Sequence, residues 1–263
     1  MTTLTAAGQA ASQETTTVMS LESVTRDYRQ GDEIVHALRS TDLHLRAGEL
    51  VGILGPSGSG KSTLLTIMGG LRTPSSGTVT ISGEPFSSLP EKRRARLRLR
   101  RIGFVLQASG LVPFLRLNDQ FGLHDRVTRT RGDTDRRDHL LDSLGISKRA
   151  HAYPSELSGG ERQRIGIARA LLADTPIVVL DEATAAADPD SEWAILQGLE
   201  RLLKGRTVLM IAHRLHTIRK ADRIVVLDNG AIAESGTHEE LLDREGTYAS
   251  LWHATAAPQG EVR

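Results

Sequence analysis

Gly55-Pro56-Ser57-Gly58-Ser59-Gly60-Lys61-Ser62 is the stretch that decides the fold of this 263-residue chain. It fits the spacing G-x-x-x-x-G-K-[ST], in which glycines let backbone N–H groups turn inward around phosphate oxygens. The apolar run Leu50–Leu54 precedes it, and a helical pattern begins at Lys61. This order predicts a nucleoside-triphosphate site at a helix N-terminus, where the helix dipole favours anions. The alternative is a Gly/Ser turn that happens to carry a lysine, and the agreement of motif and context outweighs it.

Each polar residue of the loop has an expected partner. Lys61 would reach the β- and γ-phosphates and assist the reaction, and Ser62 would offer its hydroxyl to Mg²⁺. The residues expected to bind nucleotide here are Gly55, Pro56, Ser57, Gly58, Ser59, Gly60, Lys61, Ser62 and Thr63.

Three further apolar runs lack any alternation with polar residues: Ile177–Leu180, Thr207–Ala212 and Ile224–Leu227. Strands of this kind, separated by helical patterns, are typical of a parallel sheet buried on both faces. Asp228-Asn229-Gly230 after the last run predicts a tight hairpin turn.

Other regions have different patterns. Leu43–Leu45 and Val79–Ile81 alternate, which predicts an antiparallel portion near the N-terminus. Residues 108–156 carry many charges, weak helical periodicity and no strand-like run, so we expect a helical lobe inserted in the α/β body. Residues 1–17 and 254–263 are expected to be a disordered leader and a flexible tail, which leaves 18–253 as one domain.

The composition excludes several kinds of protein. Aromatic residues are only 3% and the formal charge is +1, so we expect no specific binding of nucleic acid. The absence of cysteine excludes disulfides and thiolate metal sites. No apolar run approaches the roughly 20 residues that cross a bilayer, and we expect no signal peptide. Work at a membrane would require another chain to hold this one there.

An acidic pair, Asp181 and Glu182, follows the buried run Ile177–Leu180. The carboxyl end of a strand is where ligands bind in open α/β sheets. Asp181 would orient Mg²⁺ through water, and Glu182 would polarise the attacking water as general base. Two solvated acids at a helix start are the other interpretation, which the phosphate loop in the same chain disfavours.

A second candidate anion site begins at Leu157-Ser158-Gly159-Gly160-Glu161, before an amphipathic run to Leu172. Ser158 and Glu161 have the spacing of a capping box, which is sufficient for a helix start. A capping box does not explain two consecutive glycines, which bare backbone N–H groups for a close ligand. We therefore expect Ser158, Gly159 and Gly160 to contact an anion.

The segment LSGGERQRIGIARAL, from Leu157 to Leu171, resembles the signature motif of the ABC-family ATPases. With the phosphate loop and Asp181-Glu182 in the same order, the match covers nearly all of residues 18–250. The resemblance implies an α/β fold, with a P-loop NTPase core, a mostly parallel sheet, an N-terminal antiparallel β portion and an α-helical subdomain inserted at about 108–172. It also implies ATP and Mg²⁺ as cofactors.

The resemblance assigns roles to four more residues, one position at a time. Tyr28 stands where the family places an aromatic side chain against adenine. Gln107 resembles the glutamine that touches Mg²⁺ and the attacking water, and His213 resembles the switch histidine on the γ-phosphate. Asp188 resembles the acid of a loop that crosses the dimer interface. The plain alternatives are a half-buried strand tyrosine for Tyr28, a loop amide for Gln107 and a structural histidine for His213.

The chain departs from the family at Ala185-Ala186-Ala187-Asp188, where the family usually has Ser-Ala-Leu-Asp. A missing hydroxyl and a missing large apolar side chain bear on communication between two ATP sites. The N-terminal half resembles stand-alone ATPases of the lipoprotein-release, macrolide-export and peptide-export group. The C-terminal half resembles ATPase domains fused to exporters, so both halves indicate export.

Glu91–Arg101 holds seven basic residues and one acid. It could contact nucleic acid, but the near-neutral chain and the lack of aromatics nearby favour a solvated helix leading into the run Ile102–Leu106. Contact with anionic headgroups or a permease is a third interpretation.

The predicted function is ATP hydrolysis that powers an ABC transporter. The expected partners are a second ATPase subunit, identical or related, and membrane permease subunits, with Leu111–Phe121 forming part of a groove for a permease helix. The predicted location is the inner face of the cell membrane, peripheral and cytoplasmic. The alternative is an ABC-family ATPase that acts on nucleic acid or the ribosome.

Overall fold

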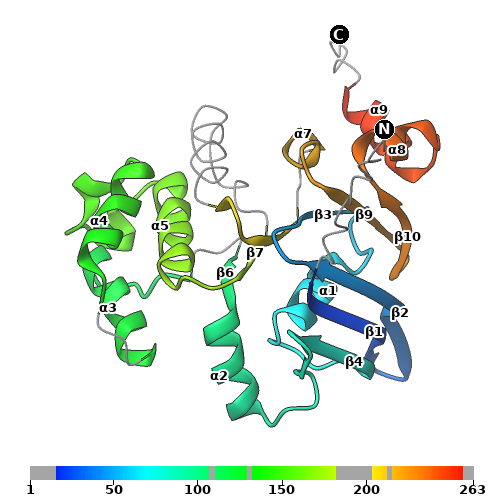
Figure 1. Ribbon diagram of the computed structural model, residues 1–263, viewed down its shortest axis with the longest axis horizontal. Helices are drawn as coiled ribbons and strands as arrows, with labels where there is room; N and C mark the ends of the chain where they lie inside the picture. The colour runs from blue at the N-terminus through cyan, green and yellow to red at the C-terminus, as the bar shows by residue number, and fades with distance from the viewer. Residues whose placement is uncertain (1–15, 107–109, 129–131, 182–202, 212–214, 257–263) are drawn as a thin grey trace, which may run out of the picture.

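The computed structural model describes residues 16–106, 110–128, 132–181, 203–211 and 215–256 and has two β-sheets with helices around them (Figure 1). The larger sheet has the strand order β10-β9-β3-β8-β7-β6, in which β10 alone is antiparallel to its neighbour. Its strands are β3 (Leu50–Leu54), β6 (Ile102–Val105), β7 (Ile177–Asp181), β8 (Thr207–Ile211), β9 (Arg223–Asp228) and β10 (Ala231–Gly236). The predicted parallel sheet is confirmed.

The apolar runs of this sheet supply two hydrophobic cores, one on each face. Ile177 and Val179 of β7 lie in one core, whereas Val178 and Leu180 lie in the other. Successive side chains of a strand point to opposite faces, so burial of both faces requires an uninterrupted apolar run. This is why these strands lack alternation.

The smaller sheet has the order β2-β1-β4-β5 and is antiparallel throughout. Its strands are β1 (Thr17–Gln30), β2 (Glu33–Arg46), β4 (Ser76–Ile81) and β5 (Glu84–Pro85). Helix α1 (Lys61–Met68) buries Leu64 and Leu65 in a core shared by both sheets. The antiparallel N-terminal portion is thus present, packed against the parallel sheet through α1.

Helices occupy the described chain beyond the β6 edge of the larger sheet, at the left of Figure 1. They are α3 (Leu117–Thr128), α4 (Thr134–Ser143), α5 (Gly159–Leu172) and the short 3-10 turns Ser147–Arg149 and Pro154–Glu156. Leu140 and Leu141 of α4 share a core with Ile165 of α5. The described residues between 110 and 172 hold no strand, in keeping with the expected helical lobe.

The C-terminal part contains the expected hairpin. Asn229 and Gly230, with φ of 46° and 78°, form the turn between β9 and β10, and Asp228 pairs with Ala231. Two positive φ values suit a two-residue hairpin turn. The helices α7 (Leu215–Ile218), α8 (His238–Asp243) and α9 (Thr247–Ala256) complete the described chain. None of the described helices is long and apolar enough to cross a membrane.

Two predicted boundaries need correction. Strand β1 begins at Thr17, inside the expected leader, because its backbone pairs with Arg46 of β2. Helix α9 continues to Ala256, so residues 254–256 of the expected tail are helical. Strand β8 is described from Thr207 to Ile211, and its predicted last residue, Ala212, lies outside the described residues, so that boundary stays a prediction.

The basic run is helix α2 (Glu91–Arg101), which leads directly into β6 as expected. The helix is less solvated than its composition indicates, because Arg94 is buried and donates to the carbonyl oxygen of Leu89. Arg98 likewise donates to the carbonyl oxygen of Gly70, at 2.8 Å. Arg98 therefore fastens the helix to the segment after α1, whereas Arg94 holds the turn that precedes the helix.

Candidate functional site

The glycine loop connects β3 to α1 and requires glycine at two of its positions. Gly55 and Gly60 have φ of 147° and 100°. A Cβ on Gly55 would lie 2.1 Å from the carbonyl oxygen of Leu227, and a Cβ on Gly60 would lie 2.5 Å from that of Ala37. Backbone from β9 and β2 thus lies directly against the loop, which leaves no room for a side chain.

Neighbouring backbone also fixes the loop from outside. The N–H of Gly230 donates to the carbonyl oxygen of Ser59 at 3.1 Å, and the N–H of Arg39 donates to that of Gly230 at 2.7 Å. The β9–β10 turn therefore connects the loop to β2. Main-chain contacts from two neighbouring strands therefore support the loop.

Lys61 and the start of α1 provide positive charge. The Nζ atom of Lys61 donates to the carbonyl oxygens of Gly55 and Pro56, each at 2.8 Å, so the ammonium group lies over the loop. Gly60 caps α1 without a side-chain hydrogen bond, and Ser62 is exposed in the first turn. Uncapped N–H groups at a helix start, together with a lysine, form a site for a phosphate-like anion.

Asp181 lies at the same edge of the sheet as the loop. It pairs with Ile211 of β8, which in turn pairs with Ile53 of β3. Two strand spacings separate Asp181 from the strand that carries the loop, which is about 10 Å. Asp181 is half-buried at the carboxyl end of β7, where ligands bind in open α/β sheets.

The described residues offer oxygen ligands to Mg²⁺ but no ready-made cage for it. Within the ranges that the structure describes, no three His, Cys, Asp or Glu side chains gather closely enough to hold a metal ion. Ser62 and Asp181 supply a hydroxyl and a carboxylate at one sheet edge. Mg²⁺ prefers a few protein oxygens combined with substrate phosphates and water, so this donor set fits it.

Tyr28 lies on β1, close to the loop. It pairs with Val35 of β2, two residues before Ala37, whose carbonyl lies against Gly60. The ring is half-buried, as the plain alternative for Tyr28 required. Two guanidinium groups approach it: Arg26 at 4.7 Å and Arg72 at 5.6 Å from the ring centroid.

Ser158 and Glu161 form the capping box that their spacing predicts. The Ser158 hydroxyl accepts from the Glu161 N–H at 3.1 Å, and the Glu161 carboxylate accepts from the Ser158 N–H at 2.8 Å. That N–H, and then the guanidinium of Arg149 at 2.7 Å, hold the pKa of the Glu161 carboxyl below its usual range. Ser158 is exposed, Gly159 is half-buried and Gly160 is buried. The helix cap is thus present, and the serine remains accessible on its outer side.

The two helix starts cannot meet within one chain. Helix α5 packs beside β6, and β6 lies three strands from β3 in the larger sheet. Three strand spacings amount to about 14 Å. The arrangement in Figure 1 agrees, with α5 on one side of the sheet strands and α1 on the other.

Several predicted residues fall outside the described ones. Strands β6, β7 and β8 end one or two residues before Gln107, Glu182 and His213. These three residues, Asp188 and the Ala185–Ala187 departure lie outside the described residues, so their roles stay predictions.

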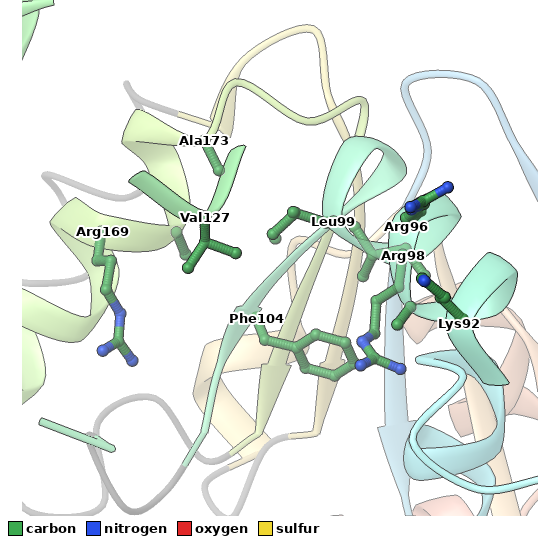
Figure 2. A pocket seen from close by; sticks show the side chains of 12 residues that line it. Lys92, Arg96, Arg98, Leu99, Phe104, Val127, Arg169 and Ala173 are labelled. Atoms are coloured by element: carbon green, nitrogen blue, oxygen red, sulfur yellow. The ribbon is translucent and has the colours of Figure 1, made fainter. Parts of the chain in front are cut away.

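A cleft that the sequence did not indicate lies between α2, β6, α3 and α5 (Figure 2). It measures about 530 Å³, and its apolar middle includes Leu99, Phe104 and Val127. Its four charged lining residues are all basic: Lys92, Arg96, Arg98 and Arg169. Burial lowers the pKa of the Arg169 guanidinium, which donates to the carbonyl oxygen of Gly110 at 3.0 Å.

A glycine-rich loop between a central parallel strand and a helix, with an acid at the end of a nearby strand, defines the class of P-loop nucleoside triphosphatases. A sequence profile described as "ABC transporter" matches residues 38–185, more than half of the chain. The chain belongs to the ABC transporter family and is an ABC ATPase domain.

Relatives and a solved structure agree with this assignment. The chain is 44% identical over 245 residues to the ATP-dependent lipid A-core flippase of Ralstonia nicotianae, covering 88% of this chain and 40% of the relative. It is 43% identical over 239 residues to the mycobactin import ATP-binding/permease protein IrtA of Mycolicibacterium thermoresistibile, covering 89% and 26%. The chain therefore spans well under half of either relative. The ATP-binding cassette MJ0796, solved as a dimer in a post-hydrolysis state bound to ADP and Pi, matches with a TM-score of 0.77 and 34% identity, over 83% of this chain and 98% of that one.

Proposed function

We propose that the chain binds ATP with Mg²⁺, hydrolyses it as one half of a two-subunit unit, and thereby powers transport by membrane permease subunits. The observation that carries the proposal is the separation of two helix starts on one chain. The loop before α1 has the glycines and Lys61, whereas Ser158 begins α5 at the far edge of the sheet. An exposed, glycine-rich helix start that lies far from the phosphate loop of its own chain suits a γ-phosphate held by another subunit.

The reaction follows from positioning and electrostatics. The loop and Lys61 bind the phosphates of ATP, and Ser158 to Gly160 of a second subunit cover the γ-phosphate. Glu182 polarises the attacking water, and Gln107 and His213 hold the water and the γ-phosphate in line. Ser62, Asp181 and Gln107 would hold Mg²⁺, which offsets phosphate charge when bound. Loss of the γ-phosphate removes the contact between subunits, so the pair opens.

A permease is the partner that the surface near α3 supports. Phe114 is 77% exposed within the proposed groove Leu111–Phe121, and Leu123 and Val127 of α3 are 41% and 60% exposed. Exposed apolar side chains are found at many protein interfaces, and Leu123 and Val127 lie one helical turn apart on α3. The basic cleft of Figure 2 adjoins them through Val127, which favours a permease segment that carries acidic residues. Such a partner would place the chain on the inner face of the cell membrane.

The domain limits and the direction of transport are part of the proposal. With β1 and α9 included, the ATPase domain extends over residues 17–256, and the helical subdomain lies at about 108–172. Export is favoured by the motifs of both halves, and the flippase relative is compatible with it. The relative named for mycobactin import has nearly the same identity, so identity alone does not decide the direction. Both relatives bear transporter names, and neither supports action on nucleic acid or the ribosome.

The shared site is tested with Ser158→Arg, whose long cation would block the approach of a second subunit. Light scattering at saturating ATP should show dimers for the unaltered chain and monomers for the variant. Ser155→Arg is the matched control, because Ser155 is also exposed but lies outside the helix start. An unchanged dimer fraction for Ser158→Arg would refute the shared site.

A further inference from the structure

The ring of Tyr28 is approached by two guanidinium groups from separate parts of the chain. Arg26 belongs to β1, two residues before Tyr28, and Arg72 follows α1. Side chains two apart on a strand lie on the same face, which brings Arg26 beside the ring. Its Cζ atom lies 4.7 Å from the ring centroid, well within the range of a cation–π contact.

Arg26 is the fixed member of this pair. Its Nη1 donates to the carbonyl oxygen of Thr73 at 3.0 Å, which ties the guanidinium to the segment after α1. Its Nε atom is buried and has no hydrogen-bond partner among the described residues. A buried N–H group without a partner is unfavourable. Because Nε contributes no hydrogen bond, the Arg26 side chain is held by the Thr73 carbonyl and by its contact with the ring. Arg72 is exposed and more distant, at 5.6 Å, and exposed cation–π contacts are the weaker ones.

The strand segment that carries this ring lies near the phosphate loop. Tyr28 pairs with Val35 of β2, and the next residues of β2 lead to Ala37, whose carbonyl lies against Gly60. Thr73, which anchors Arg26, lies five residues beyond the last residue of the helix that begins in the loop. Helix α1 therefore connects these parts: the phosphate loop precedes it, and Thr73, which anchors Arg26 beside the Tyr28 ring, follows it.

We infer that Arg26 is a positioning residue for the nucleotide base: its guanidinium holds the Tyr28 ring as a preformed stacking surface. This inference rests on the proposed function, because it requires the base of ATP to stack on Tyr28. A ring already fixed loses little conformational freedom when the base binds, which strengthens binding without any new contact to ATP. Arg26 acts on the base half of the nucleotide and leaves the phosphate half unaffected.

The test compares two variants of the full chain that differ in charge. Arg26→Gln removes the cation, and its shorter side chain ends before the Thr73 carbonyl, whereas Arg26→Lys keeps a cation on a longer side chain. Isothermal titration measures the affinity for MgATP and for inorganic tripolyphosphate, which has no base. Arg26→Gln should weaken ATP binding about threefold to tenfold and leave tripolyphosphate binding unchanged, with kcat within twofold. Arg26→Lys should recover much of the lost affinity. Arg29→Gln is the control, since Arg29 is exposed at the adjacent position of the same strand.

The possible results separate the inference from the proposed site. If Tyr28→Ala leaves ATP binding unchanged, the base does not stack there, and that part of the proposed function fails together with the inference. If Tyr28→Ala weakens ATP binding but Arg26→Gln does not, the inference alone is wrong. Equal losses for ATP and tripolyphosphate in Arg26→Gln would mean a general structural role, which also overturns it. If Arg26→Gln does not fold, an Arg26→Lys chain with ATP affinity as low as that of Tyr28→Ala would overturn the inference.

Discussion

Gly60→Ala should destabilise the protein through backbone strain and through a steric clash. A second glycine of the same loop, Gly58, allows the two effects to be measured separately. At a φ of 100°, a side chain strains the backbone, which costs on the order of 1–2 kcal/mol. The new Cβ would also lie 2.5 Å from the carbonyl oxygen of Ala37, so β2 or the loop must shift. Overpacking of this kind adds about 1–3 kcal/mol. We expect a total loss of about 3 kcal/mol in the free energy of unfolding.

Gly58→Ala is the matched control for this prediction. Gly58 also has a positive φ, 79°, but a Cβ there would meet no atom within 4 Å. It should therefore lose only the backbone part, about 1 kcal/mol. For a domain of this size, the melting temperature should fall by about 6–12 °C for Gly60→Ala and about 2–4 °C for Gly58→Ala. Differential scanning calorimetry without nucleotide measures folding separately from binding. The reasoning is refuted if Gly60→Ala melts no lower than Gly58→Ala.

Two other variants test the reaction and the contact between α4 and the body. Glu182→Gln should bind ATP and dimerise but hydrolyse it at least about 100-fold more slowly, since it lacks a general base; wild-type phosphate release would contradict the assigned role. Asp174 accepts from Arg136 of α4 at 2.6 Å and from Arg206 at 2.8 Å, and the Arg136 guanidinium foremost holds the pKa of this carboxyl below its usual range. A lowered carboxyl pKa stabilises the fold above the unfolded pKa, and this stability is lost as the pH falls through the folded pKa. Because the Asp174 side chain is 63% exposed, Asp174→Asn should cost only about 0.5–1 kcal/mol at pH 7, and urea unfolding should show the difference shrinking below about pH 4. A difference that stays constant down to pH 2 would count against the ion pair as its cause.

Local patterns were sufficient for much of the fold. The strands of the larger sheet were predictable because an apolar run without alternation has few stable arrangements except burial on both faces. The turn at Asn229-Gly230 was predictable because those residues tolerate positive φ, which both adopt. The capping box of Ser158 and Glu161 was predictable because its two hydrogen bonds lie within one helical turn.

The features that the sequence did not indicate all depend on residues distant along the chain. Arg26 and Tyr28 share a strand, and their spacing could have suggested contact, but no local signal places Arg72 beside them. The basic cleft combines Arg96 and Arg98 of α2 with Arg169 of α5, some 70 residues later. Arg98 of the basic helix donates to the carbonyl oxygen of Gly70, 28 residues earlier. Such groupings are set by how the helices pack on the sheet, which a single sequence does not encode locally.

The structure reconciles the structural and the functional interpretation of Ser158. A hydroxyl has two acceptor positions and one donor. In the capping box the Ser158 hydroxyl accepts from the Glu161 N–H, so its own proton remains available to donate to a phosphate oxygen of a partner's ATP. Glu161 would repel that phosphate, yet its carboxylate is bound by the Ser158 N–H and by Arg149, whose positive charge offsets it. The lowered pKa of Glu161 keeps the carboxylate ionised, and the cap intact, further into the acid range than for an ordinary glutamate. The cap therefore fixes the serine at the exposed helix start, from which the proposed contact with a second subunit's phosphate would be made.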